Sequence, residues 1–80
     1  MRRYIVVMAD FKPVSPERYN YAIKKVERFM NKLKIWLASQ GHPDVIFGMP
    51  TVFGMFAVMC DASAISIIRD CPGVASVLVD

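Results

Sequence analysis

A long amphipathic helix with clear start and stop signals constrains the fold more than any other feature of this sequence. The run Ser15–Glu17 is typical of a helix start, because serine caps free amide groups, proline suits the first helical position and glutamate stabilises the positive end of the helix dipole. Gly41 can take the left-handed conformation that closes a helix, and Pro43 prevents its continuation. The sequence therefore predicts a helix over residues 16–40.

Apolar side chains recur in this helix at three- and four-residue steps, the spacing that produces one buried stripe. The stripe consists of Tyr19, Ala22, Ile23, Val26, Met30, Leu33 and Leu37. Phe29 and Trp36 flank it, and we expect both to widen the core. The opposite side is basic, since the segment Glu17–Trp36 holds six lysines and arginines against two glutamates and leaves a charge of −1, out of the total of +3, for the rest of the chain.

Four apolar runs rich in β-branched and aromatic residues are expected to form strands. They are Tyr4–Ala9, Asp44–Met49, Thr51–Cys60 and Val74–Val79. Pro50 has no amide hydrogen for a central ladder, so we predict that it lies in a hairpin turn or at a strand edge. Gly48 and Gly54 indicate a bulge, or a place where another backbone or a bulky ring approaches closely.

A second, shorter helix is expected over residues 62–70, where Asp61 can cap its start and Pro72-Gly73 ends it. The order of elements is then β-α-β-β-α-β. Short connections and right-handed crossovers place both helices on one face of a four-stranded antiparallel sheet. We therefore predict an α+β, ferredoxin-like sandwich, and a length of 80 residues leaves room for a single domain spanning 1–80.

Both alternating faces of the predicted strands are apolar, although two helices can cover only one face of a sheet. Apolar residues make up 55% of the chain, against roughly 45–50% in an average globular protein, and a domain this small hides only about 60% of its unfolded surface. We expect the uncovered face to bind another protein. Alternation alone does not decide which residues face outward, so the binding candidates come from both sets: Tyr4, Val6, Met8, Phe53, Met55, Phe56 and Val58.

The sequence predicts no catalytic, metal or cofactor site, so we expect the protein not to be an enzyme. Its serines, cysteines and carboxylates show no spacing that singles out a nucleophile, a base and an orienting acid, and His42 lies in a segment typical of a solvated turn. One histidine and the lack of a Cys-x-x-Cys pair exclude a recognisable zinc site. Cys60 and Cys71 are expected to be reduced core thiols.

The sequence also argues against membrane insertion. The longest uncharged run, Val45–Cys60, contains two glycines and a proline and is shorter than the roughly 20 residues that a membrane helix needs. The apolar stretch after Arg3 ends at Asp10, which suits a strand better than a signal peptide. We expect a soluble, cytoplasmic protein, with secretion or fusion to a protease as the alternative.

Three segments resemble the subtilisin propeptide and proteinase-inhibitor family: Arg3–Val7, the stretch Gly48–Phe56 with its Gly-aromatic pattern, and Pro72–Asp80. The resemblance implies a ferredoxin-like domain whose exposed sheet face docks on two parallel helices of a subtilisin-like serine protease. It further implies that the end of the chain lies in the active-site cleft, with Asp80 as the acidic final residue. Such a domain acts as a protease inhibitor or as an intramolecular chaperone.

Two alternatives remain open at this point. The first is a single-stranded nucleic-acid-binding domain that uses sheet aromatics together with the basic helix residues Lys24, Lys25, Arg28 and Lys32. This alternative is disfavoured, because the basic residues are expected on the helix side of the sheet, away from the aromatic side chains. The second is a homodimer in which the uncovered sheet faces of two copies pack together.

Overall fold

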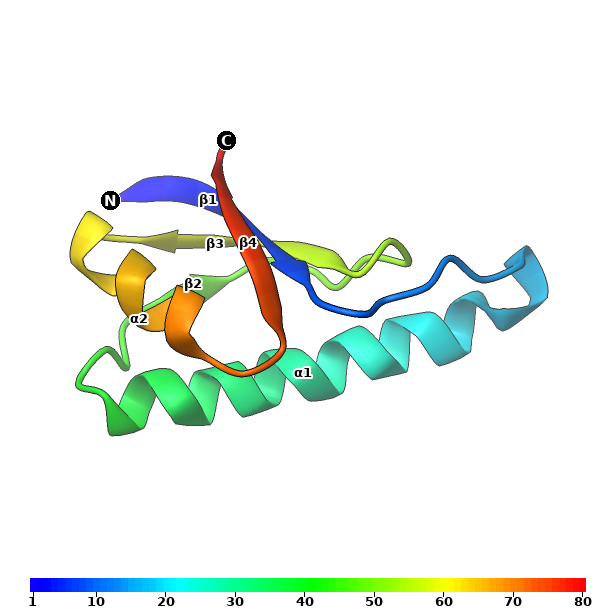
Figure 1. Ribbon diagram of the computed structural model, residues 1–80, viewed down its shortest axis with the longest axis horizontal. Helices are drawn as coiled ribbons and strands as arrows, with labels where there is room; N and C mark the ends of the chain where they lie inside the picture. The colour runs from blue at the N-terminus through cyan, green and yellow to red at the C-terminus, as the bar shows by residue number, and fades with distance from the viewer.

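The computed structural model describes all 80 residues and contains the expected elements in the expected order (Figure 1). The strands are β1 (Arg2–Met8), β2 (Ile46–Phe47), β3 (Met55–Cys60) and β4 (Val74–Val79), and the helices are α1 (Tyr19–Ser39) and α2 (Ile65–Asp70). The strands form one antiparallel sheet in the order β2-β3-β1-β4, and both helices lie on the same side of it. The α+β prediction is confirmed, and the strand order and helix count match a ferredoxin-like arrangement.

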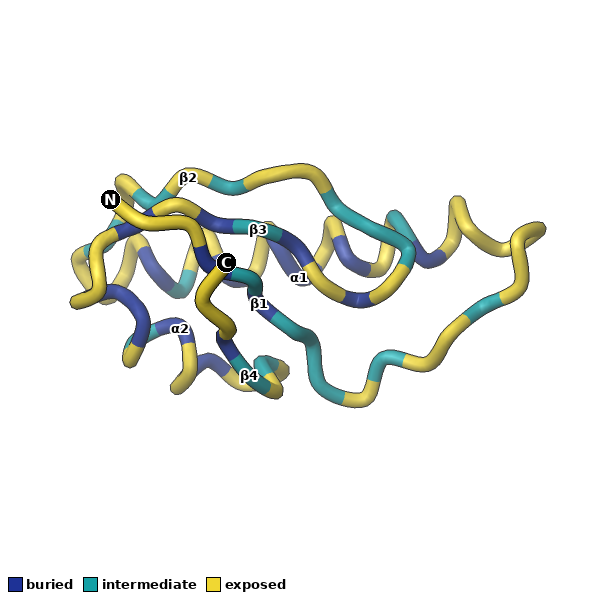
Figure 2. The backbone as a smooth tube through the Cα atoms, turned by 90° about the horizontal axis from the view of Figure 1, so that it is seen from above, coloured by how far each residue is buried: buried dark blue, intermediate teal, exposed yellow.

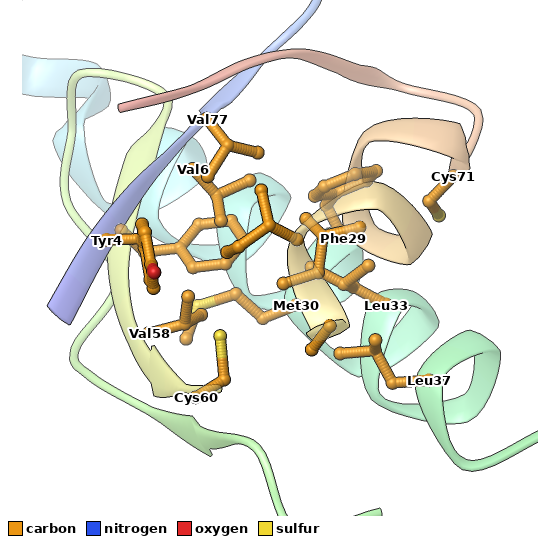
Figure 3. Packing of buried hydrophobic residues seen from close by; sticks show 14 of the residues in the cluster. Tyr4, Val6, Phe29, Met30, Leu33, Leu37, Val58, Cys60, Cys71 and Val77 are labelled. Carbon is orange, nitrogen blue, oxygen red and sulfur yellow. The ribbon is translucent and has the colours of Figure 1, made fainter. Parts of the chain in front are cut away.

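The hydrophobic core lies between the sheet and the two helices (Figure 3). Tyr4 is paired with Val58, and Val6 with Phe56. Directly paired residues point to the same side of a sheet, and all four of these side chains are buried against the helices. The Phe56 ring lies 6.2 Å from the ring of Phe29 on α1 and 5.9 Å from that of Phe47. The strands thus contribute one of their two alternating sets to the core.

Helix α1 is longer than the sheet that it covers. At 1.5 Å per residue its 21 residues extend for about 31 Å, and its first turns project beyond the sheet (Figure 1). Within the predicted stripe Tyr19 is therefore exposed and Ile23 half-buried. The other five residues are buried: Ala22, Val26, Met30, Leu33 and Leu37. Phe29 widens the core as expected. The half-buried Trp36 donates its indole N–H to the carbonyl of Ile67 at 3.1 Å, which ties α1 to α2.

The two ends of α1 follow the sequence signals to different extents. A single 3₁₀ turn, Pro16–Arg18, precedes the α-helix, and the Ser15 side chain makes no capping hydrogen bond. At the other end Gly41 has a φ of +87°, and the His42 N–H donates to the carbonyl of Leu37 at 2.8 Å. This is the Schellman arrangement, so the predicted stop is confirmed, whereas the α-helix starts three residues later than predicted.

The hairpin between β2 and β3 is shorter than its apolar runs predicted. Residues 48–54 form a loop, in which Pro50 lies as expected. The Thr51 hydroxyl donates to the carbonyl of Met55 at 2.6 Å and accepts the N–H of Phe53 at 3.2 Å. A side chain thus satisfies backbone groups that a continued strand ladder would have paired. The apolar residues of this loop remain at the surface.

The glycines that sequence singled out mark close approaches, as predicted. A Cβ at Gly54 would lie 2.4 Å from the Phe11 ring, and one at Gly48 would lie 3.3 Å from the carbonyl oxygen of Ala57. Phe11 belongs to the segment between β1 and α1, so its contact with Gly54 fixes that segment against the β2–β3 loop. The conformations of these two segments therefore depend on each other.

Candidate functional site

The side of the sheet that faces away from the helices is apolar and has nothing packed on it. The pairs Ile5 with Ala57 and Val7 with Met55 point to this side. Leu78 joins them opposite Ile5, and Ile46 lies opposite Met59. The surface they form is called here the open sheet face, and its residues are Ile5, Val7, Ile46, Met55, Ala57, Met59 and Leu78. None of these side chains carries a charge.

Exposure differs strongly between the two sides of the same strands (Figure 2). On the open sheet face Ile46 is 54% exposed, Leu78 52% and Met59 42%, whereas Val6 on the helix side is fully buried. Figure 2 shows the strands from the side opposite α1, with intermediate and exposed residues alternating with buried ones. Apolar area of this kind, gathered on one face, is what marks binding surfaces on small proteins.

A groove of about 490 Å³ lies on the open sheet face beside the 48–54 loop. Apolar side chains line most of it, including Ile46, Met49, Met55 and Met59, and the small residues Gly48 and Ala57 also contribute. Arg3 is its one charged lining residue. Two residues of this loop are strongly exposed, since Met49 is 82% and Phe53 71% accessible. The loop therefore extends the apolar surface beyond the strands.

The structure divides the residues that the sequence offered as protein-binding candidates. Phe53 and Met55 lie at the surface, and Met8 is half-buried against the core. The other four belong to the core, so the prediction that they bind a partner is wrong: Tyr4, Val6, Phe56 and Val58. The physical reason is parity: the register of β1 with β3 turns these even-numbered residues toward the helices. Their odd-numbered neighbours form the open sheet face in their place.

Asp80, the remaining candidate, lies at the rim of the open sheet face. Its carboxylate forms an ion pair with the Arg3 side chain, with Oδ2 and Nε 2.7 Å apart, and its N–H donates to the Arg3 carbonyl at 3.3 Å. Both side chains are largely exposed, so the pair contributes at most about 1 kcal/mol to stability. Its main consequence is electrostatic, because the one cation beside the groove is neutralised.

The basic residues proposed for nucleic-acid binding lie on a different surface. Lys24, Lys25, Arg28 and Lys32 are exposed on α1, which covers the opposite side of the sheet. The Lys25 ammonium lies 5.7 Å from the centre of the Phe11 ring, in the segment before the helix. These cations and the open sheet face thus lie on opposite sides of the domain.

Both cysteines are buried, as predicted, and neither is paired. Burial raises the pKa of the Cys60 thiol above its ordinary value of 9.0, and the nearby Asp61 and Asp44 carboxylates raise it further. Burial also raises the pKa of Cys71, although Lys32 partly opposes the change. The two thiols are thus protonated and poorly reactive at neutral pH.

These two pKa shifts predict a loss of stability in alkali. Because the thiols ionise more easily in the unfolded chain than in the folded one, their contribution to the free energy of unfolding is complete below about pH 9 and decreases as the pH rises through the raised folded values. Urea unfolding at pH 7 to 10.5 measures the free energy of unfolding. The stability advantage of the wild type over a Cys60→Ala, Cys71→Ala variant should shrink above pH 9. An advantage that stays constant across this range would contradict the prediction.

The chain contains no cluster of three or more His, Cys, Asp and Glu side chains that could hold a metal ion. None of its helices is both long enough and apolar enough to cross a membrane. A scan against protein-family models finds no match, and searches of curated proteins and of solved structures likewise find no similar protein. The resemblance to the subtilisin propeptide family accordingly stays a prediction that depends on the residues quoted for it.

Proposed function

We propose that this protein is a non-catalytic protein-binding domain that docks its open sheet face on a second protein. The observation that carries the proposal is the apolar surface formed by the open sheet face and by Met49, which lines the same groove. If about 400 Å² of it is covered, the burial contributes on the order of 10 kcal/mol before association costs are subtracted. Association itself costs about 4–15 kcal/mol, so the fit of the partner decides how much of this gain remains as affinity.

The buried core under the open sheet face and the flexible side chains on it both suit a docking role. Its strands rest on a core that is fully buried underneath, at Val6, Phe56 and Val58, so the backbone platform is held in place before binding. Three exposed methionines, Met49, Met55 and Met59, lie along the groove. Methionine is flexible and polarisable, so it adapts to the shape of a partner. A preformed platform with adaptable side chains matches the requirements of a binding module.

The resemblance in sequence makes a subtilisin-like serine protease the first partner class to test. In that family the sheet face supplies the contact with the protease, and the open sheet face has the required apolar character. Asp80 is bound to Arg3, so we expect sheet docking, rather than insertion of the chain end into the cleft, to supply most of the affinity. Protease inhibition and assistance of protease folding are both consistent with such docking.

A capture experiment with matched variants tests the proposal. Met59→Asp places a carboxylate on the open sheet face, and Ile35→Asp makes the same change at a 72% exposed apolar residue of α1. We expect immobilised wild-type protein and Ile35→Asp to capture the same partner, and Met59→Asp to lose it. Arg3 lies opposite position 59 but is already paired with Asp80, so the new carboxylate leaves one negative charge without a countercharge, and its desolvation weakens binding by at least about 100-fold. Titration calorimetry with the purified partner gives the change in Kd, and a subtilisin-like protease serves as the first purified probe.

Two outcomes of this experiment would contradict different statements. A partner that binds Met59→Asp as tightly as the wild type would exclude the open sheet face as the binding surface. A subtilisin-like protease that the wild type neither binds nor inhibits would exclude this partner class alone. Circular dichroism of each variant confirms that the fold is retained before binding is compared.

A further inference from the structure

We infer that a second copy of this chain is the partner that covers the open sheet face when no other protein does, giving a symmetric dimer with the two sheets packed face to face. The inference deepens the proposed function, since it rests on the same surface and names an occupant for it. The layers of the dimer are helices, sheet, sheet and helices. Three properties of the surface favour this occupant: its charge, its area and its shape.

The distribution of charge favours self-pairing. The side chains of the open sheet face are uncharged, and the one cation that points to the same side, Arg3 opposite Met59, is neutralised by Asp80. The positive charge of the chain is concentrated on α1, on the far side of the sheet. In a face-to-face dimer the two sheets alone are about 10 Å apart and the helices lie further out, so the basic helices are separated by more than the Debye length of about 8 Å. Two copies therefore meet without electrostatic repulsion, although each has a net charge of +3.

The available area approaches what a dimer needs. The four strands hold 7, 2, 6 and 6 residues, 21 in all, and at about 4.8 Å between strands and about 3.3 Å per residue they give a flat footprint of about 330 Å². Met49, which is 82% exposed and lines the groove, lies outside this footprint and adds to it. Two copies give about 660 Å² of flat area, and the side chains that project from it, Met49 included, bring the buried surface toward the roughly 1,000 Å² that a specific interface needs.

The shape of the surface is compatible with a twofold axis. An isologous interface needs a projection and a recess on the same surface, because each copy must supply both. The groove of about 490 Å³ is the recess, and it includes the small residues Gly48 and Ala57. The loop that borders it carries Met49, which lines the groove and projects with 82% of its surface exposed. Both halves of a self-complementary contact are therefore present on one chain.

Sedimentation velocity and equilibrium at 1 to 200 µM test the inference. We expect the wild type to sediment at twice its chain mass of 9.0 kDa, and the dimer to persist between 50 mM and 1 M NaCl because the contact is apolar. Met55→Asp should raise the dimer Kd by at least 100-fold, since symmetry places the new charge in the interface twice. Ile35→Asp, which makes the same type of change on the outer side of α1, should leave the dimer intact.

The other results overturn the inference in recognisable ways. A wild type that remains monomeric at 200 µM excludes self-pairing, and the capture experiment with Met59→Asp then still decides whether the open sheet face binds a different protein. If neither Met55→Asp nor Met59→Asp weakens the dimer, the two copies pair through another surface, for instance along the free edge of β4. If Met55→Asp fails to fold by circular dichroism, the partly buried Ala57 and the exposed Met59 of the same face offer Ala57→Lys and Met59→Asp as replacements with the same expected loss.

Discussion

Replacing Phe56 by aspartate is expected to unfold the domain, whereas the same replacement at the neighbouring Met55 is expected to leave it folded. Phe56 is 1% exposed and packs between the rings of Phe29 and Phe47. Removing a buried phenylalanine costs about 3–5 kcal/mol, and the carboxylate adds the cost of burying an unpaired charge. An 80-residue domain is stable by only about 4–12 kcal/mol, so the substitution removes most or all of its stability.

Met55 provides the matched comparison, because it is adjacent in sequence and points to the opposite side of the sheet. Its side chain is already 36% exposed, so we expect a much smaller loss than at Phe56, made up mainly of the lost dimer contacts. Far-ultraviolet circular dichroism and urea unfolding of both variants measure the contrast. Equal stability of the two variants would show that the side of the sheet has been assigned incorrectly, and the proposed binding surface would be lost with it.

Replacing Gly54 by alanine is expected to cost about 2–5 kcal/mol. Gly54 has a φ of +72°, and an added Cβ would lie 2.4 Å from the Phe11 ring. The left-handed conformation costs a residue with a Cβ about 1–2 kcal/mol, and displacing a packed ring costs about 1–3 kcal/mol more. We also expect the segment between β1 and α1 to loosen, because Phe11 is what holds it against the β2–β3 loop.

Gly41 separates the two contributions. It has a φ of +87°, but an added Cβ would meet no atom within 4 Å, so Gly41→Ala should show the conformational cost alone. Urea midpoints of both variants give the comparison, and amide hydrogen exchange in residues 9–15 reports on the loosened segment. The clash with Phe11 is absent if Gly54→Ala and Gly41→Ala lose the same stability.

The order of elements was accessible from the sequence because local signals specify it. The stop of α1 at Gly41 and the strand Val74–Val79 are where the sequence placed them. The start of α1 and the length of β2 were less accurate. Ser15 is a typical capping residue, but its hydroxyl accepts no hydrogen bond from the first N–H groups of the helix, and the Thr51 hydroxyl satisfies backbone groups that the predicted strands would have paired. Competition between side-chain and backbone hydrogen bonds is not visible in an apolar pattern.

The binding surface was only half accessible from the sequence. Alternation along β1 and β3 identified two sets and an uncovered face, but both sets are apolar, so alternation does not indicate which of them faces outward. Phe56 and Val58 are as apolar as Met55 and Met59, yet the first two are buried and the last two exposed. The rim pair of Arg3 and Asp80 joins residues from the two ends of the chain, and no local pattern predicts such a contact.

By itself the sequence determined that the chain forms an α+β domain with more apolar surface than two helices can cover, because composition, periodicity and helix signals act locally and are written in consecutive residues. Only the tertiary structure decided which set of strand residues is covered. That decision depends on the register of β1 with β3 and on where α1 packs, and a shift of one residue would have exchanged the two sets. Register is a property of contacts between distant segments, and for this reason the open sheet face became identifiable only in three dimensions.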